Sequence, residues 1–123
     1  MADHSPGFLK VVNAAKAKIK QLTVDQVWKK IQAGEKFHFL DVREDEEWAM
    51  GRAKGSIHLG KGVIERDIEA MIPDKNAEII LYCGGGFRSA LSAESLLVMG
   101  YTRVVSMDGG IREWRQKGLP EEN

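Results

Sequence analysis

The stretch Ile79-Ile80-Leu81-Tyr82-Cys83-Gly84-Gly85-Gly86-Phe87-Arg88-Ser89 passes from an apolar run, through three glycines, into a pattern typical of a helix. The apolar run predicts a buried strand, and the spacing from Arg88 to Met99 predicts the helix. Cys83 then stands at the C-terminal end of the strand and faces the first turn of the helix. Free N–H groups at that turn favour an anion, and therefore the thiolate, so Cys83 is a candidate nucleophile.

Cys83 is the only cysteine of the chain, and a lone cysteine is more often a buried structural residue. The three glycines that follow it favour the reactive interpretation. Glycine lets the backbone take positive φ and approach a ligand closely, which a cysteine of the core does not require.

The composition indicates one globular domain with no charged partner. A chain of 123 residues, of which 43% are hydrophobic and 29% charged, fits one hydrophobic core. Lys and Arg number 18, as do Asp and Glu, so no net charge would draw the chain to nucleic acid or to an anionic membrane. A single free thiol suits a reducing compartment, and no apolar segment reaches the ~20 residues of a membrane span. We expect a cytoplasmic protein without a signal peptide.

Helical and strand patterns alternate along the chain. Residues 7–20 carry apolar side chains at helical spacing, and Thr23 is a candidate N-cap for a helix that runs to residue 33 and stops at Gly34. This alternation is typical of a parallel sheet that helices cover on both faces. The further predicted elements are helices over 63–71, 89–99 and 111–117, and strands over 37–42, 56–59, 79–82 and 104–107.

Residues that carry chemistry follow several of the predicted strands. In parallel sheets with such connections, the functional crevice lies outside the carboxyl ends of the strands. Asp41 and Arg43, Cys83, and the segment Asp108-Gly109-Gly110 each stand at a predicted strand end. We therefore expect that they could share one site, although the two glycines of the last segment are better interpreted as turning the chain.

Four groups of residues follow one another in a specific order. They are Leu40-Asp41-Val42-Arg43-Glu44 with Glu47-Trp48; Gly51 with Gly55-Ser56-Ile57-His58-Leu59; the loop from Tyr82 to Ser89; and Met107-Asp108-Gly109-Gly110-Ile111 with Trp114 and Gly118-Leu119-Pro120. In this order they resemble a single-domain rhodanese, a thiosulfate-handling sulfurtransferase. The resemblance implies an α/β fold of three layers, α/β/α, with a five-stranded parallel sheet. It also implies a rhodanese-like domain over 21–123 after an N-terminal helical extension over 1–20.

The resemblance further implies an enzyme that carries sulfur as a persulfide on Cys83. The thiolate would take the outer sulfur of thiosulfate or of a persulfide donor and pass it to a thiol, to cyanide or to a protein acceptor, in two steps. No metal and no cofactor is implied. The residues expected to bind the transferred sulfur, chiefly through backbone N–H groups, are Gly84, Gly85, Gly86, Phe87 and Arg88.

Three further residues are expected to support the site, namely Ser89, Asp41 and Arg43. Arg88 could face the donor anion or bind a carboxylate such as Asp41, and both alternatives stay open. Ser89 could cap the helix or bond to the substrate.

The position after the cysteine is uncharged. Many rhodaneses have a basic residue where this chain has Gly84, and Phe87 is apolar as well. A donor less charged than thiosulfate, such as glutathione persulfide or a protein persulfide, is therefore an alternative. Arg43, Arg52 and Lys61 could supply positive charge from neighbouring loops.

Two other classes of function compete with sulfur transfer. Phosphatases and arsenate reductases of related fold use C-x5-R, whereas the spacing from Cys83 to Arg88 is C-x4-R, and a shorter ring suits a single sulfur better than a tetrahedral oxyanion. A catalytically silent interaction module of the same fold would not need the cysteine. The histidines, His4, His38 and His58, are scattered and suggest no zinc site.

Overall fold

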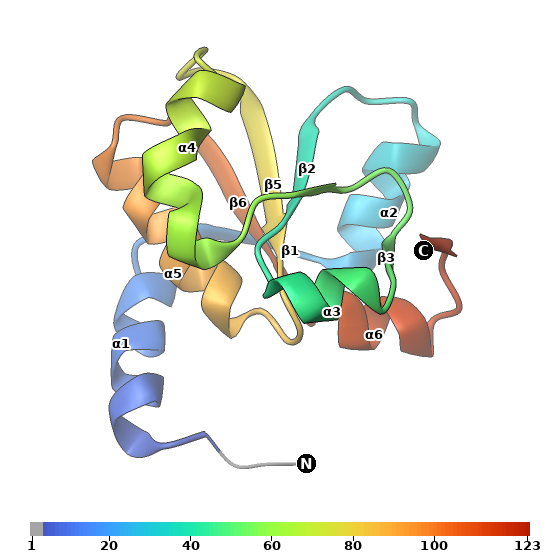
Figure 1. Cartoon of the computed structure of the whole chain (residues 1–123), viewed down its shortest axis with the longest axis horizontal. Helices are drawn as coiled ribbons and strands as arrows, with labels where there is room; N and C mark the ends of the chain where they lie inside the picture. Colours follow the sequence, from blue (N-terminus) through green and yellow to red (C-terminus); the bar gives the residue numbers. More distant parts are fainter. Residues whose placement is uncertain (1–3) are drawn as a thin grey trace.

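The computed structural model describes residues 4–123 as three layers with a parallel sheet in the middle (Figure 1). The strand order in this part of the chain is β1-β6-β5-β2-β4, and every neighbouring pair is parallel. A separate antiparallel pair is formed by β3 (Arg52–Ala53) and β7 (Glu121–Glu122). The predicted α/β fold with a five-stranded parallel sheet is confirmed. The strands of the sheet are β1 (Lys20–Thr23), β2 (His38–Asp41), β4 (Ile57–His58), β5 (Glu78–Tyr82) and β6 (Arg103–Asp108).

The helices lie on both faces of the sheet, as the pattern of alternating elements predicts (Figure 1). On one face lie α4 (Ile64–Met71), which a 3-10 turn over Lys61–Val63 precedes, and α5 (Phe87–Val98). On the other face lie α2 (Val24–Gln32) and α6 (Gly110–Gln116). The short α3 (Asp45–Ala49) follows β2, and α1 (Pro6–Lys16) packs against α5 outside the sheet.

Alternate side chains of β5 serve the two faces. Ile79 and Leu81 belong to the core beneath α4 and α5, and Cys83 continues this side. Ile80 and Tyr82 belong to the core beneath α2 and α6. All five side chains are at most 1% exposed. Because β5 is buried on both faces, consecutive residues of the strand must be apolar. This explains the continuous apolar run from Ile79 to Tyr82 that precedes Cys83.

The helix predicted over 7–20 is wrong at its C-terminal end. The helix α1 ends at Lys16, and residues 20–23 form β1, which pairs with β6 from Lys20 opposite Val105 to Thr23 opposite Asp108. The backbone bonds to β6 decide this segment, because its own side chains are largely exposed. Residues 1–3 of the predicted extension lie outside the described residues. In the described part of the chain, no helix is long and apolar enough to cross a membrane.

The predicted start of α2 is confirmed in detail. Thr23 Oγ1 accepts a hydrogen bond from the backbone N–H of Gln26 at 3.1 Å, and the Gln26 side chain accepts one from the backbone N–H of Thr23 at 2.8 Å. This reciprocal pair is a capping box, which satisfies N–H groups that the first turn would otherwise leave unpaired. The cap places the end of β1 next to the start of α2.

Candidate active site

Cys83 follows β5 directly and is 1% exposed. The backbone N–H groups of Gly86 and Ser89 donate to its Sγ at 3.2 and 3.4 Å. These donors belong to the start of α5, where the helix dipole also favours negative charge. Two backbone N–H donors and the N-terminal end of α5 therefore face the cysteine sulfur.

Ser89 contacts the cysteine and does not cap α5. Gly86 holds the N-cap position, with a left-handed φ of 102°. The Cys83 thiol donates to Ser89 Oγ at 3.5 Å, and this oxygen shares a hydrogen bond of 2.7 Å with Ser106 Oγ on β6. The two buried serines thus tie the sulfur to the neighbouring strand.

The first turn of α6 holds the cysteine loop through two backbone hydrogen bonds. The N–H groups of Ile111 and Arg112 donate to the carbonyl oxygens of Cys83 and Gly84, at 2.9 and 3.0 Å. This contact requires glycine at position 110, where φ is 56° and a Cβ atom would lie 2.5 Å from the Cys83 carbonyl oxygen. Gly110 therefore does more than turn the chain, because it lets the start of α6 hold the cysteine loop.

Arg88 binds a carboxylate, but the carboxylate belongs to Glu47 of α3 and not to Asp41. Its two terminal nitrogens donate to Glu47 Oε1 at 2.6 Å and Oε2 at 3.0 Å. This bidentate bond lowers the pKa of Glu47 and raises the pKa of Arg88. The guanidinium is thereby fixed in one orientation at the edge of the loop.

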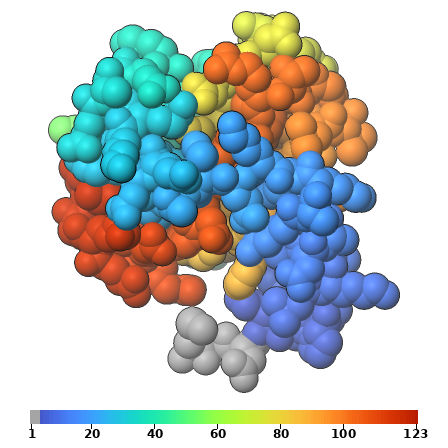
Figure 2. Space-filling model, turned by 180° about the vertical axis from the view of Figure 1, so that it is seen from behind, coloured from blue at the N-terminus to red at the C-terminus, as the bar shows by residue number. Residues whose placement is uncertain are grey.

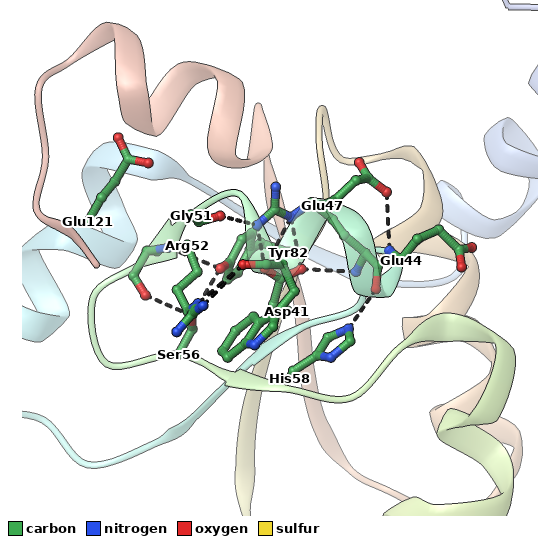
Figure 3. Close-up of polar contacts among 12 residues, drawn as sticks. Asp41, Glu44, Glu47, Gly51, Arg52, Ser56, His58, Tyr82 and Glu121 are labelled. Carbon is green, nitrogen blue, oxygen red and sulfur yellow. Dashed lines mark hydrogen bonds and ion pairs between the residues drawn. The ribbon is translucent and has the colours of Figure 1, made fainter. Parts of the chain in front are cut away.

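Asp41 and Arg43 form a buried ion pair of their own, 0% and 3% exposed. Arg43 donates from Nε and Nη2 to the Asp41 carboxylate at 2.7–3.0 Å, and from Nη2 to the Gly51 carbonyl oxygen at 2.7 Å. Burial would lower the pKa of Arg43, but the hydrogen bonds and the charge of Asp41 raise it. Figure 3 shows the polar contacts in this region, with Asp41, Gly51 and Glu47 labelled. The pair joins the end of β2 to Gly51, in the segment after α3.

A cavity of about 290 Å³ opens in front of the cysteine. One side consists of the cysteine loop with Arg88, and another side comes from α1 and the residues before it. A second cavity, of about 350 Å³, adjoins it through Gly84 and Arg112 and reaches Arg43 and Glu47. The residues that line the first cavity are His4, Phe8, Cys83, Gly84, Gly85, Phe87, Arg88 and Arg112.

The positive charge next to the cysteine loop is supplied by Arg88 and Arg112, and not by the residue directly after Cys83. A Cβ atom on Gly84 would lie 3.2 Å from an Arg88 nitrogen, and one on Gly85 would lie 3.3 Å from an Arg112 nitrogen. A side chain at either position would therefore require the guanidinium group beside it to shift by a few tenths of an ångström. Of the basic residues suggested from neighbouring loops, Arg52 instead lies over the Trp48 ring, 4.1 Å from its centroid.

The histidines lie apart from one another. His58 bonds to the Arg43 carbonyl oxygen at 2.8 Å and stacks on Trp48, His38 starts β2, and His4 lines the first cavity. Within residues 4–123, no group of three His, Cys, Asp or Glu side chains could hold a metal ion.

Comparison with known proteins settles the family. A family model described as Rhodanese-like domain matches residues 23–117. The chain belongs to the rhodanese-like family. The putative sulfurtransferase YtwF of Bacillus subtilis is 32% identical to this rhodanese-like chain over 103 residues, which cover 84% of the chain and 97% of the relative. The thiosulfate sulfurtransferase GlpE of Actinobacillus succinogenes is 32% identical over 102 residues, which cover 83% of the chain and 89% of the relative.

Solved structures of similar fold extend this comparison to the N-terminal helix. A protein of unknown function from Rhodopseudomonas palustris, described as a possible tyrosine phosphatase, has a TM-score of 0.88 and 26% identity and covers 99% of both chains. The polysulfide-sulfur transferase homodimer of Wolinella succinogenes has a TM-score of 0.79 and 27% identity, with 94% of this chain and 87% of that chain covered. The family match and the relatives named as sulfurtransferases support a sulfurtransferase-like function for this rhodanese-like protein.

Several residues of the rhodanese-like site were not identified from the sequence. Glu47 belongs to a group of residues that carries the family resemblance, but no local pattern pairs it with Arg88, 41 positions away. Arg112, His4 and Phe8 carried no motif. A signal for Gly110 was present in its glycine pair, but only the packing of α6 on the cysteine loop shows why glycine is needed.

Proposed function

We propose that this protein is a sulfurtransferase that moves a sulfane sulfur from thiosulfate or a persulfide donor to a thiol or cyanide through a persulfide on Cys83. The observation that carries the proposal is the pair of backbone N–H groups, on Gly86 and Ser89, that point at the sulfur from the start of α5. They stabilise an anion at this position in both halves of the reaction.

In the first half-reaction the Cys83 thiolate attacks the outer sulfur of the donor. A sulfur–sulfur bond forms to Cys83, the sulfur–sulfur bond within the donor breaks, and sulfite leaves thiosulfate with the electron pair. Backbone N–H groups of the loop from Gly84 to Arg88 are proposed to hold the outer sulfur of the persulfide. Arg112 lines the cavity and adds positive charge that attracts the anionic donor, whereas the charge of Arg88 is balanced by Glu47.

In the second half-reaction an acceptor thiolate or cyanide attacks the outer sulfur, and Cys83 leaves again as a thiolate. Because the chain has no second cysteine, the persulfide must be discharged by an external acceptor, which could be a small thiol or a protein. We also propose that residues 21–123 form the rhodanese-like domain after an extension over 1–20. A reducing, cytoplasmic location would keep the thiol free.

The assay for this proposal follows transfer from thiosulfate to cyanide and to a small thiol at varied concentrations of both substrates. We expect parallel double-reciprocal plots, the signature of a two-step reaction through a covalent intermediate, and no turnover with Cys83→Ser. Intersecting plots, or turnover that survives in Cys83→Ser, would rule out the Cys83 persulfide.

Phosphate hydrolysis is a second candidate, because a structure that covers 99% of both chains is described as a possible tyrosine phosphatase. Two features of this chain favour sulfur transfer instead. The loop from Cys83 to Arg88 is one residue shorter than C-x5-R, and Arg88 already binds Glu47 with two terminal nitrogens. Hydrolysis of an aryl phosphate by the wild-type protein and not by Cys83→Ser would reverse this ranking.

A further inference from the structure

The cavity in front of Cys83 has an aromatic wall, which we define as His4, Phe8 and Phe87. The His4 ring meets the Phe87 ring edge-on with 4.4 Å between centroids, and the Phe8 ring meets it edge-on at 6.3 Å. His4 and Phe8 precede residue 23, where the match to the family begins. Most of this wall is therefore supplied by a segment outside the matched domain.

The helix α1 holds the aromatic wall in place. Val12 and Ala15 of this helix are fully buried, and α1 packs against α5. Lys16 adds two contacts, because its Nζ lies 4.7 Å from the centroid of the Phe87 ring and 3.9 Å from Asp108 Oδ1. Figure 2 shows the blue atoms of α1 beside a small amber area of the chain after β5. The rings are thus positioned against the cysteine loop.

We propose that the aromatic wall binds the apolar arm of an organic sulfane-sulfur donor, and this inference rests on the proposed sulfurtransferase function. The cavity, at about 290 Å³, is close to the lower end of the roughly 300–1,000 Å³ of sites for small organic molecules. Its lining is mixed, because it includes the aromatic wall and the side chains of Arg88 and Arg112. An inorganic anion can contact only the polar groups, whereas an organic anion with a flat apolar group also covers the rings.

Thiosulfonates, R–SO2–S⁻, are suitable probes because they combine one negative charge with an arm that can be varied. The Cys83 thiolate attacks the outer sulfur, a sulfur–sulfur bond to Cys83 forms, and the bond from that sulfur to the sulfonyl sulfur breaks. The sulfinate R–SO2⁻ leaves with the electron pair. No other reactant is needed for this step.

The experiment compares benzenethiosulfonate with methanethiosulfonate, and measures the rate at which Cys83 gains one sulfur atom in a single turnover. The ratio of the two rates is compared between proteins, which cancels the different intrinsic reactivity of the donors. We expect Phe8→Leu and His4→Ala each to lower this ratio by about two- to tenfold, the range for loss of an aromatic contact. Val11→Ala is the control, because Val11 lies on α1, is 50% exposed and does not line the cavity.

The outcomes separate this inference from the function on which it rests. If the ratio of the two loading rates in Phe8→Leu and in His4→Ala equals the wild-type ratio, the inference is overturned. The proposed sulfurtransferase function would stand in that case, because Cys83 would still gain sulfur. Failure of the wild-type protein to take sulfur from any donor would overturn the proposed function as well. If circular dichroism shows that Phe8→Leu reduces the helix content, the ratio of loading rates in His4→Ala still tests the inference. His4 is exposed and precedes α1, so its substitution leaves the helix intact.

Discussion

Gly110 is predicted to be the glycine on which the geometry of the cysteine loop depends most. Alanine there would have to adopt a φ of 56° and would place Cβ 2.5 Å from the Cys83 carbonyl oxygen. The left-handed backbone costs an alanine about 1 kcal/mol, and moving α6 away loses the two hydrogen bonds to Cys83 and Gly84, about 1 kcal/mol each. We expect Gly110→Ala to lower the free energy of unfolding by about 3 kcal/mol in all.

Gly118 offers a matched control for this prediction. Its φ is 67°, but a Cβ atom would meet nothing within 4 Å. Gly118→Ala should therefore cost only the backbone strain, about 1 kcal/mol. Urea unfolding of both variants measures the difference, and single-turnover sulfur loading from thiosulfate measures the effect on the site. We expect loading to slow by about tenfold or more in Gly110→Ala alone, because the loop is displaced. Equal losses of unfolding free energy in the two variants, or unchanged loading in Gly110→Ala, would refute the reasoning.

Two further predictions concern the ion pairs around the site. The Arg88 hydrogen bond lowers the pKa of Glu47 below its ordinary value of 4.5, so the pair stabilises the fold above about pH 4.5, and this contribution is lost as the pH falls through the lowered pKa. Glu47→Gln should remove that part of the pH dependence, which urea unfolding at several pH values measures. If the free energies of unfolding of wild type and variant differed by the same amount from about pH 3 to 7, the prediction would be contradicted. Arg43→Met leaves the fully buried Asp41 carboxylate without its partner, so we expect the free energy of unfolding to fall by about 3–5 kcal/mol. The same change at Arg66, in an exposed ion pair, should have no measurable effect, and equal effects in the two variants would refute this account.

The buried strands were predictable because their side chains carry the signal. The central residues of these strands, Phe39-Leu40, Ile79 to Tyr82 and Val104-Val105, are apolar and buried, so the strands show no alternation of exposed and buried residues. The position of Cys83 follows from the second of these runs and from the glycines behind it. The sequence alone therefore identifies Cys83 as the candidate nucleophile.

The edge strand β1 could not be predicted from its own residues. Lys20, Gln21 and Thr23 are exposed and only Leu22 is partly buried, so the segment shows neither a period of two nor an apolar run. What makes it a strand is backbone pairing with β6, more than eighty positions away. The expectation of a fifth strand came instead from the family resemblance.

The hydrogen-bond partners of the side chains at the site could likewise not be predicted from the sequence. The choice for Arg88 between a donor anion and a carboxylate depends on where α3 lies relative to α5, which local patterns do not encode. The Asp41 carboxylate is bound by Arg43, and Arg88 binds Glu47 instead. Contacts of this kind need the tertiary structure.

The most direct measurement of the central claim is the intact mass of the reduced protein after incubation with thiosulfate and removal of excess donor. We predict a gain of one sulfur atom that is absent in Cys83→Ser and that cyanide reverses. An unchanged mass with thiosulfate and with persulfide donors alike would contradict a Cys83 persulfide, and with it the proposal that this protein transfers sulfur.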